Sequence, residues 1–328
     1  MSKIDTPQQQ AVQVFMQTKS KHLAVRARAG TGKTYLLEKV ARNFSPKERA
    51  VALAFNTANA KELSTRLPTN VRCCTFHSLG FSALKRMWGQ KMQPSRDRQR
   101  QLVERIVPFN TPNRLSTMSH VLRATSLSMN ALAQTDEEVM AILMDHDIPF
   151  EQGIEPRSFV NWVLDTMIAS LQKTDTPSFD DMIYIPAALG WPTGSFQKLL
   201  VDEVQDTNNA QMALVRNAAA DSGQFNIYGD DRQALYRFRG AGAGQFDQIK
   251  FDLQAEELPL NWTFRCPRRV VELAKTIVED YTATPEAPEG AVYWRSESAM
   301  LRDAQPGDAV ISRTNYGCMR VDRKSTRL

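Results

Sequence analysis

The sequence predicts an α/β fold in which a parallel sheet is interrupted by a helical insertion. Three observations support this fold class. Short apolar segments alternate with helix-compatible segments over the first 82 residues, the strand signal disappears between about residues 81 and 189, and the alternation resumes at Lys198–Val201 and Phe225–Tyr228. Strands that alternate with helices form parallel sheets with both faces covered, so the two outer parts are expected to build one sheet.

Three strands and three helices are expected in the first part of the chain. The first helix covers residues 4–16, with Thr6 as its N-cap and Pro7 in its first turn, where the fixed φ of proline suits a helix. The other elements alternate along the chain: strands at His22–Arg26, Ala50–Ala54 and Val71–Thr75, and helices from Lys33 to about Asn43 and from about Thr57 to Leu67.

The segment from residue 83 to residue 189 is expected to be a helical insertion domain. Arg98–Val107, Asp136–Asp145 and Ser158–Leu171 have helical periodicity, and proline-bearing turns separate them. Residues 1–82 and 190–280 would then be the two parts of the sheet domain.

Residues 281–321 are expected to contain a linker and the start of a second α/β domain. Thr282–Gly290 is rich in Pro, Thr, Glu and Gly, as linkers are, and Ala309–Ser312 is expected to be a strand. Asp322–Leu328 (DRKSTRL) resembles the in-frame translation of a sequencing-library adapter and is expected to be a non-native tail. The alternative is an ordinary polar tail.

Composition narrows the class of protein. Lys and Arg outnumber Asp and Glu, and the resulting net charge of +5 favours a polyanionic partner without establishing one. The four cysteines have neither metal-site spacing nor the density of a disulfide scaffold, so reduced, buried thiols are expected. There is no basic-then-apolar leader, and no apolar run approaches the ~20 residues of a membrane helix. A cytoplasmic protein with no membrane partner is expected.

A phosphate-binding loop is predicted between the first strand and its helix. Ala27–Thr34 (ARAGTGKT) follows a strand and opens a helix, which is the context that a P-loop requires. Lys33 is expected to bind the β- and γ-phosphates of a nucleotide, and the Thr34 hydroxyl to bind Mg²⁺. Backbone N–H contacts to phosphate are expected from Ala29, Gly30, Thr31 and Gly32. The alternative is a chance flexible turn before a helix.

An acidic pair is predicted to complete the nucleotide site. Leu199–Val201 is an apolar segment that delivers Asp202 and Glu203 to its carboxyl end, an arrangement typical of a Walker B motif. Asp202 is expected to hold Mg²⁺, directly or through water, and Glu203 to polarise the water that attacks the γ-phosphate. The alternative, a solvated acidic turn, is disfavoured by the P-loop in the same chain.

Six segments, in this order, resemble the motifs of the UvrD/Rep/PcrA-type superfamily 1 DNA helicases. They are Thr6–Val12 (TPQQQAV), Ala54–Thr57 (AFNT) with Ala60, Thr75–Gly80 (TFHSLG), Asp202–Asn208 (DEVQDTN), Tyr228–Ala241 (YGDDRQALYRFRGA) and Phe264–Pro267 (FRCP). The resemblance covers about residues 4–275, and the helical insertion is weakly covered. It implies a P-loop RecA-like domain, interrupted by the insertion and followed by the start of a second RecA-like domain.

The resemblance also implies roles around the nucleotide. Gln8 would hydrogen-bond the edge of the adenine, Gln233 would sense the γ-phosphate, and Arg265 would place its guanidinium on that phosphate. With Lys33 and Glu203, the last two residues would make up the catalytic group. The chain departs from the family directly after the P-loop, where relatives often have arginine and this chain has Tyr35, so Tyr35 is given no role.

A second set of residues would face DNA if the resemblance holds. These residues are Phe55, Thr75, His77, Tyr236 and Phe238. Flat side chains stack on any base, which suits a protein that is indifferent to DNA sequence. For the aromatic residues the alternative is a place in the core. His77 is expected to order the loop beside the DNA rather than to bind metal, because no second ligand accompanies it.

The function implied by the resemblance is that of an ATP-dependent helicase or translocase acting on single-stranded DNA, with 3′→5′ polarity, in DNA repair or replication. The cofactors would be ATP and Mg²⁺, and the partners single-stranded DNA and its junctions with duplex. The chain is expected to bind ATP without being a competent motor, since the late motifs of the second RecA-like domain are missing. Two alternatives are the motor portion of a helicase–nuclease and a nucleotide-gated DNA-binding module that does not unwind.

Overall fold

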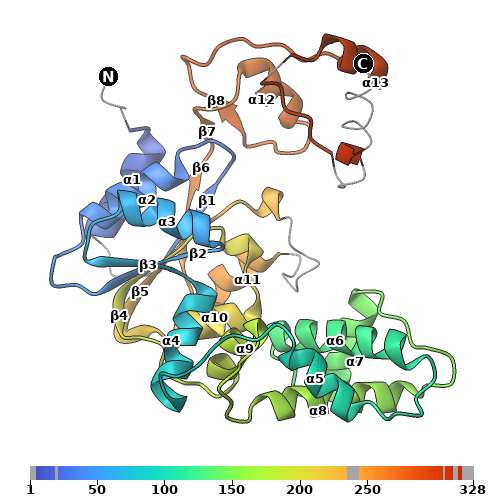
Figure 1. Ribbon diagram of the computed structural model, residues 1–328. Helices are drawn as coiled ribbons and strands as arrows, with labels where there is room; N and C mark the ends of the chain where they lie inside the picture. The colour runs from blue at the N-terminus through green and yellow to red at the C-terminus, as the bar shows by residue number, and fades with distance from the viewer. Residues whose placement is uncertain (1–4, 19–20, 235–243, 306, 313–316, 320–328) are drawn as a thin grey trace.

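The computed structural model describes residues 5–18, 21–234, 244–305, 307–312 and 317–319. Its centre is a six-stranded sheet in the order β3-β2-β4-β5-β1-β6, and all neighbouring strands are parallel (Figure 1). The strands are β1 (Leu23–Ala27), β2 (Ala50–Ala54), β3 (Val71–Thr75), β4 (Phe196–Val201), β5 (Ala219–Gly229) and β6 (Glu256–Leu260). The predicted α/β fold with a parallel sheet is confirmed.

Helices cover both faces of this sheet, because the strand side chains are apolar on both sides. Along β2, Val51 and Leu53 belong to one buried cluster, and the alanines between and beside them belong to the other. One face packs against α1 (Pro7–Thr18), α2 (Lys33–Arg42) and α3 (Thr57–Arg66). The other packs against α4 (Phe76–Trp88), α10 (Asn209–Arg216) and α11 (Gln245–Asp252). A strand buried on both sides explains the continuous apolar runs in the sequence.

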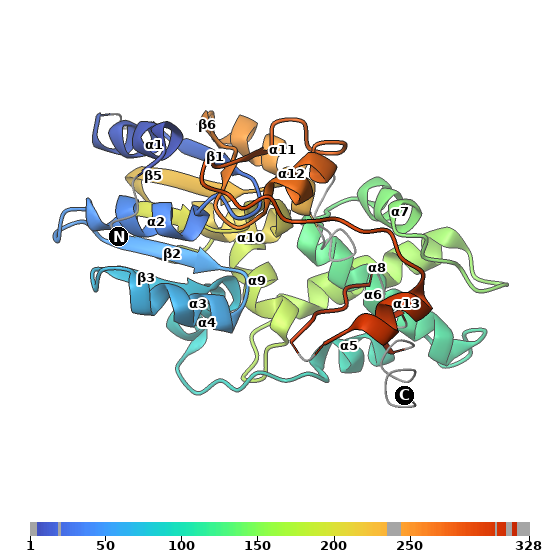
Figure 2. The same ribbon diagram turned by 90° about the horizontal axis from the view of Figure 1, so that it is seen from above.

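The helices between β3 and β4 form a unit with its own apolar core, beside the sheet in Figure 2. After α4 come α5 (Arg98–Ile106), α6 (Arg114–Ala131), α7 (Asp136–Asp145), α8 (Pro156–Ser170) and α9 (Phe179–Ala188). Sequence-encoded caps begin two of them: Thr135 with Glu138 at α7, and Ser178 with Asp181 at α9. Asp181 is fully buried and pairs with Arg98 Nε at 2.8 Å, which ties α5 to α9.

The remaining short elements surround the nucleotide site or follow it. They are the 3₁₀ turns η1 (Val204–Asp206) and η2 (Asp231–Gln233), β7 (Trp262–Thr263), α12 (Arg268–Ala274), β8 (Thr282–Ala283) and α13 (Glu297–Asp303). β8 pairs in parallel with β7, so the segment expected to be a linker begins as a strand. Within the described ranges, no helix is both long and apolar enough to span a membrane.

Two expectations about the chain were wrong. Ala309–Ser312 is not a strand, and Ile311 is 92% exposed. A strand is stable only when it pairs with a neighbour, and neither described sheet includes this segment. All four cysteines are free thiols, but only Cys74 is buried, and Cys318 is exposed. Cys74 is buried because it lies in β3 and packs in the sheet core.

Candidate functional site

The P-loop lies at the carboxyl end of β1 and is held close to the segment that follows β6. Phe264 N donates to Gly30 O at 2.9 Å. Gly30 and Gly32 have left-handed backbones, with φ of 71° and 80°. A Cβ on Gly30 would lie 2.5 Å from Arg265 Cβ and 2.7 Å from Thr263 Oγ1. Glycine is therefore required at position 30 both by its φ and by the close approach of the neighbouring loop.

Helix α2 begins directly behind this loop, at Lys33, with Gly32 as its N-cap. No side chain caps the helix, and no acidic residue lies in its first turn. The first N–H groups of a helix and its dipole together bind anions, so this helix end suits a phosphate. Gly30, Thr31, Lys33 and Thr34 all line one cavity of about 330 Å³ at this point, and the Ala29 carbonyl accepts a hydrogen bond from Tyr281 OH at 2.8 Å.

The side chain of Lys33 is paired with the acidic residues that follow β4. Its Nζ lies 3.2 Å from Asp202 Oδ1 and 2.5 Å from Glu203 Oε1. Burial lowers the pKa of Lys33, but the two carboxylates outweigh burial and hold that pKa above its usual value. Burial also raises the pKa of Asp202, the deeper carboxylate, despite the Lys33 charge. Burial acts in the same sense on Glu203, but Lys33 and Gln205 keep its pKa below the usual value.

Glu203 is held in an uncommon backbone conformation. Its φ of 53° and ψ of 44° are left-handed, a region that a non-glycine residue adopts only when its surroundings impose it. Glu203 N donates to Asp202 Oδ1 at 3.0 Å, and Gln205 Nε2 donates to Glu203 Oε2 at 2.8 Å. The two carboxylates share Lys33 but differ in exposure: Asp202 is buried, and Glu203 is partly exposed and lines the nucleotide cavity.

Two more predicted residues, Gln233 and Arg265, line the same cavity. Gln233 comes from η2, after β5, and its Nε2 donates to Asp230 Oδ2 at 2.5 Å. Arg265 and Phe264 come from the loop after β7, on the side of the P-loop where Gly30 makes its close contact. The structure thus brings together Lys33, Glu203, Gln233 and Arg265 from four separate segments.

Gln8 and its neighbour Gln9 are placed differently. Gln8 Oε1 accepts a hydrogen bond from Asn261 N at 2.8 Å, and Gln8 does not line the cavity. Gln9 is buried, lines the cavity, and donates from Nε2 to Thr31 O at 3.2 Å. It also forms a reciprocal cap with Thr6 at the start of α1, the N-cap expected from the sequence. Gln9 was not predicted as a site residue, although its spacing of three from Val12 places both residues on one face of the helix.

The oxygen atoms at this site fit a magnesium ion. Asp202 and Thr34, the two predicted ligands, supply a carboxylate and a hydroxyl; Thr34 lines the cavity, and Asp202 lies beside Lys33. Mg²⁺ usually keeps several waters and binds one or two protein oxygens together with substrate phosphates. These two side chains are oxygen donors of the kind that Mg²⁺ prefers.

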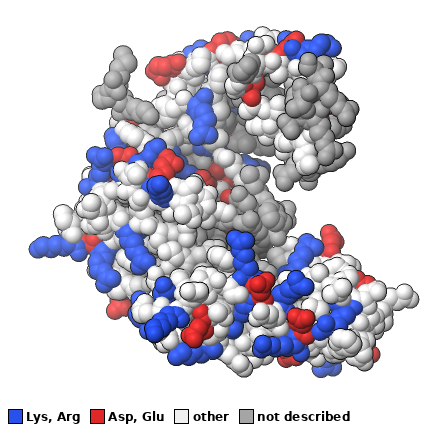
Figure 3. All heavy atoms as spheres, viewed as in Figure 1, with Lys and Arg blue, Asp and Glu red and all other residues white. Residues whose placement is uncertain are grey.

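A larger cavity, of about 810 Å³, lies between the sheet and the helical unit. Phe55, after β2, and His77, in α4, line it from the sheet side, and Arg96 and Arg123 line it from the helical side. Figure 3 shows that basic side chains outnumber acidic ones over the helical unit on this face. His77 stacks edge-on against Phe179, with ring centroids 6.1 Å apart. Two aspartates, Asp180 and Asp206, also line the cavity, so it combines aromatic rings with charges of both signs.

Of the other three residues predicted to face DNA, the structure describes only Thr75. Thr75 is the N-cap of α4, where its Oγ1 accepts from Ser78 N at 3.2 Å, and it does not line the larger cavity. Tyr236 and Phe238 lie outside the described residues. Arg123, which the sequence analysis missed, is in α6 and belongs to no motif.

The parallel sheet, the P-loop and the acidic pair at the end of β4 define a P-loop nucleotide-binding protein. The family model for the UvrD/REP helicase N-terminal domain matches residues 4–254. The chain belongs to this family.

Its relatives are DNA helicases. The chain is 24% identical over 285 residues to the ATP-dependent DNA helicase Rep of Buchnera aphidicola subsp. Baizongia pistaciae (strain Bp), which covers 78% of this chain and 40% of that protein. It is 25% identical over 313 residues to the ATP-dependent DNA helicase PcrA of Bacillus subtilis (strain 168). This match covers 85% of this chain and 40% of that protein. A shorter match to DNA helicase II of Escherichia coli (strain K12) is 37% identical over 86 residues. It covers 26% of this chain and 12% of that protein. The chain thus spans 40% of the length of the first two relatives.

Proposed function

We propose that the chain is the nucleotide-binding portion of an ATP-dependent helicase or translocase that acts on single-stranded DNA. One observation carries the proposal: Lys33 of the P-loop is paired with Asp202 and Glu203 in a cavity that Gln233 and Arg265 also line. These residue types support the proposal, because phosphoryl transfer to water uses a phosphate-binding lysine, a carboxylate, and polar or cationic groups near the γ-phosphate. Calorimetric titration of the chain with Mg²⁺-ATP tests the proposal, and failure to bind would contradict it.

The residues divide the chemistry of ATP hydrolysis among themselves. The P-loop backbone and Lys33 bind the phosphates, Glu203 orients the attacking water, and Arg265 neutralises negative charge that develops on the γ-phosphate. Gln233 hydrogen-bonds the same phosphate. Mg²⁺, when bound with the nucleotide at Asp202 and Thr34, supplies further neutralising charge. Lys33 must exchange its carboxylate partners for phosphate oxygens when ATP binds.

Gln8 is proposed to select adenine, and its replacement provides a test. The Gln8 oxygen is occupied by Asn261 N, which fixes the amide and leaves Nε2 to donate to the base. Gln8→Ala is expected to reduce the preference for ATP over GTP by about tenfold, since an unpaired polar group costs ~1–3 kcal/mol. Competition of ATP and GTP for the chain measures this preference.

Gln10→Ala is the matched control for Gln8→Ala. Gln10 is in the same helix, is exposed, and donates to Asp5 O at 3.2 Å, away from the cavity. Its replacement should leave base selectivity unchanged. If Gln9→Ala removed the preference and Gln8→Ala did not, the role assigned to Gln8 would belong to its buried neighbour.

Single-stranded DNA is proposed to bind along the larger cavity, where Phe55 can stack on a base. Phe55→Ala is expected to weaken binding of an oligothymidylate by about tenfold, because base–aromatic stacking contributes ~1–3 kcal/mol per base. Fluorescence anisotropy at fixed low salt measures the affinity. Phe251→Ala is the control, since Phe251 is 77% exposed on α11 and does not line the cavity. Equal losses in both variants would contradict DNA contact by Phe55.

Polarity is proposed from the family resemblance alone. A protein that contains this chain together with the rest of the motor is proposed to move 3′→5′ and to open junctions of single-stranded and duplex DNA. Duplexes with a 3′ tail and with a 5′ tail distinguish the two directions, and unwinding of the 5′-tailed duplex alone would contradict the proposal.

A further inference from the structure

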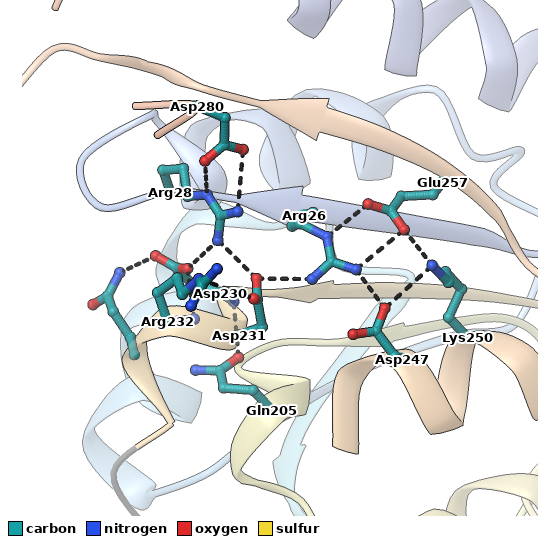
Figure 4. A network of polar contacts seen from close by, with 11 residues as sticks. Arg26, Arg28, Gln205, Asp230, Asp231, Arg232, Asp247, Lys250, Glu257 and Asp280 are labelled. Atoms are coloured by element: carbon teal, nitrogen blue, oxygen red, sulfur yellow. Dashed lines mark hydrogen bonds and ion pairs between the residues drawn. The ribbon is translucent and has the colours of Figure 1, made fainter. Parts of the chain in front are cut away.

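Arg28, inside the P-loop, lines the nucleotide cavity, and its guanidinium lies in a group of carboxylates (Figure 4). Its Nε and Nη2 bind both oxygens of Asp280, at 2.9 and 3.1 Å. Its Nη1 lies 2.9 Å from Asp230 Oδ1 and 2.7 Å from Asp231 Oδ1. The side chain is 8% exposed. Bidentate hydrogen bonds restrict the orientation of a guanidinium. Arg28 therefore links the P-loop, the segment at Asp230 and the segment at Asp280.

Asp230 connects Arg28 to two residues of the proposed reaction. Asp230 Oδ2 accepts from Gln233 Nε2 at 2.5 Å, which fixes the γ-phosphate sensor. Asp230 N donates to Gln205 Oε1 at 3.0 Å, and Gln205 Nε2 donates to Glu203 Oε2 at 2.8 Å. The Asp230 carboxylate therefore joins Arg28 to Gln233, and the Asp230 backbone N–H is joined through Gln205 to Glu203.

A second arginine in the network does not reach these residues. Arg26 Nη1 lies 2.8 Å from Asp231, and its other nitrogens bind Asp247 and Glu257 (Figure 4). Lys250 binds the same two outer carboxylates, at 3.2 and 2.6 Å. The outer half of the network, formed by Arg26 and Lys250 with Asp247 and Glu257, thus ties β1 to α11 and β6. The inner half, formed by Arg28 with Asp230 and Asp280, reaches the nucleotide site.

The segment around residue 280 holds the P-loop at two points. Asp280 binds the Arg28 side chain, and Tyr281 OH donates to the Ala29 carbonyl at 2.8 Å. Tyr281 is buried, and its hydrogen bond to Ala29 is partly buried. The segment after α12 therefore fixes both the backbone of the P-loop and the side chain that leads to Asp230.

We propose that Arg28 is a positioning residue, restrained by Asp280, which holds Asp230 so that Gln233 and Glu203 face the γ-phosphate. The inference rests on the proposed function. Asp230 is 3% exposed and needs a cationic partner. Without Arg28 its carboxylate loses this partner and turns toward water. This change moves the acceptor that fixes Gln233, while the P-loop contacts to the α- and β-phosphates remain.

The test compares ADP with a non-hydrolysable ATP analogue, the β,γ-imido triphosphate, by calorimetry in Mg²⁺. The wild-type chain should prefer the triphosphate. Arg28→Lys keeps the charge but loses the planar fork, and it is expected to reduce that preference about tenfold while ADP affinity stays within about twofold. Asp280→Asn should produce a smaller loss in the same direction. Lys250→Gln, which breaks only outer contacts, should change neither affinity.

Several outcomes would overturn the inference. An unchanged preference in Arg28→Lys would show that Arg28 does not position the γ-phosphate contacts. Equal losses of ADP and triphosphate affinity, with a lower unfolding temperature, would show that Arg28 only maintains the fold. Equal binding of both nucleotides by the wild-type chain would remove the sensing role on which the inference depends. A wild-type chain that binds neither nucleotide would instead refute the proposed function, and the inference with it.

Discussion

Replacing Lys33 by alanine is expected to lower the affinity for Mg²⁺-ATP by at least about a hundredfold, which corresponds to ~2.7 kcal/mol. Two effects add. The variant loses charge-assisted hydrogen bonds to the phosphates, each contributing ~1.5–3 kcal/mol. It also leaves Asp202 and Glu203 without the cation that lies within 3.2 Å of both. A triphosphate would then enter a site that carries two uncompensated negative charges. Calorimetric titration measures the affinity.

Lys39→Ala is the matched control for Lys33→Ala. Lys39 lies in the same helix, but its Nζ binds Asp5 Oδ2 at 2.6 Å, away from the phosphates. Its replacement should leave ATP affinity unchanged. Lys33→Met, which keeps the apolar stem, checks that loss of binding does not come from a collapsed loop. Similar ATP affinity in wild type, Lys33→Ala and Lys33→Met would contradict the P-loop assignment.

The strands could be predicted where burial determines their composition. Ala50–Ala54 and Val71–Thr75 were predicted with the bounds that β2 and β3 have. β5 is longer than expected, since it begins at Ala219 rather than near Phe225. Its first residues are partly or fully exposed, so they carry no apolar pattern, and pairing with β4 extends the strand there. Pairing between strands is a property of the fold, which local composition does not reveal.

The same distinction applies to the nucleotide site. The P-loop and the acidic pair are local motifs, so the sequence was sufficient to predict them. The partners of Gln8 and Arg28 were not predictable, because Asn261 and Asp280 lie 253 and 252 positions away along the chain. Local sequence patterns do not predict contacts between residues so far apart in the chain. It arises because β1 lies between β5 and β6, which brings the segments after these strands together around the P-loop.

Only some of the residues that line the larger cavity could be predicted from the sequence. One wall comes from motif residues, so Phe55 and His77 could be proposed in advance. The other wall comes from the helical unit, which has no motif, and Arg123 reaches the cavity only because α6 packs near the sheet. Helical periodicity predicts which positions are buried within the unit, but not which exposed positions face another unit.

Replacing Glu203 by glutamine is expected to reduce ATP hydrolysis by about 10²–10⁴-fold, the usual contribution of a general base, while ATP affinity stays the same or rises. Glutamine has nearly the same size as glutamate but cannot accept the proton of the attacking water. Binding is spared because Lys33 Nζ lies 2.5 Å from Glu203 Oε1 and must leave it for phosphate. A neutral side chain makes that exchange easier.

Single-turnover hydrolysis measures this effect on the chain itself, with enzyme in excess over labelled ATP and with an oligothymidylate present. Slow conversion of one bound ATP is then detectable even where steady-state turnover is not. Glu38→Gln is the control, because Glu38 pairs with Arg42 on the exposed side of α2 and does not line the cavity. It should hydrolyse ATP at the wild-type rate.

The comparison of binding with hydrolysis separates catalysis by Glu203 from a structural role. Glu203 has a left-handed backbone and shares Gln205 with Asp230, so its replacement could also disturb the turn after β4. A disturbed turn would weaken ATP binding, because Asp202 and Lys33 belong to the same cluster. Loss of hydrolysis with full ATP affinity therefore identifies Glu203 as the base. Equal hydrolysis rates for Glu203→Gln and wild type would assign the activation of water to another residue.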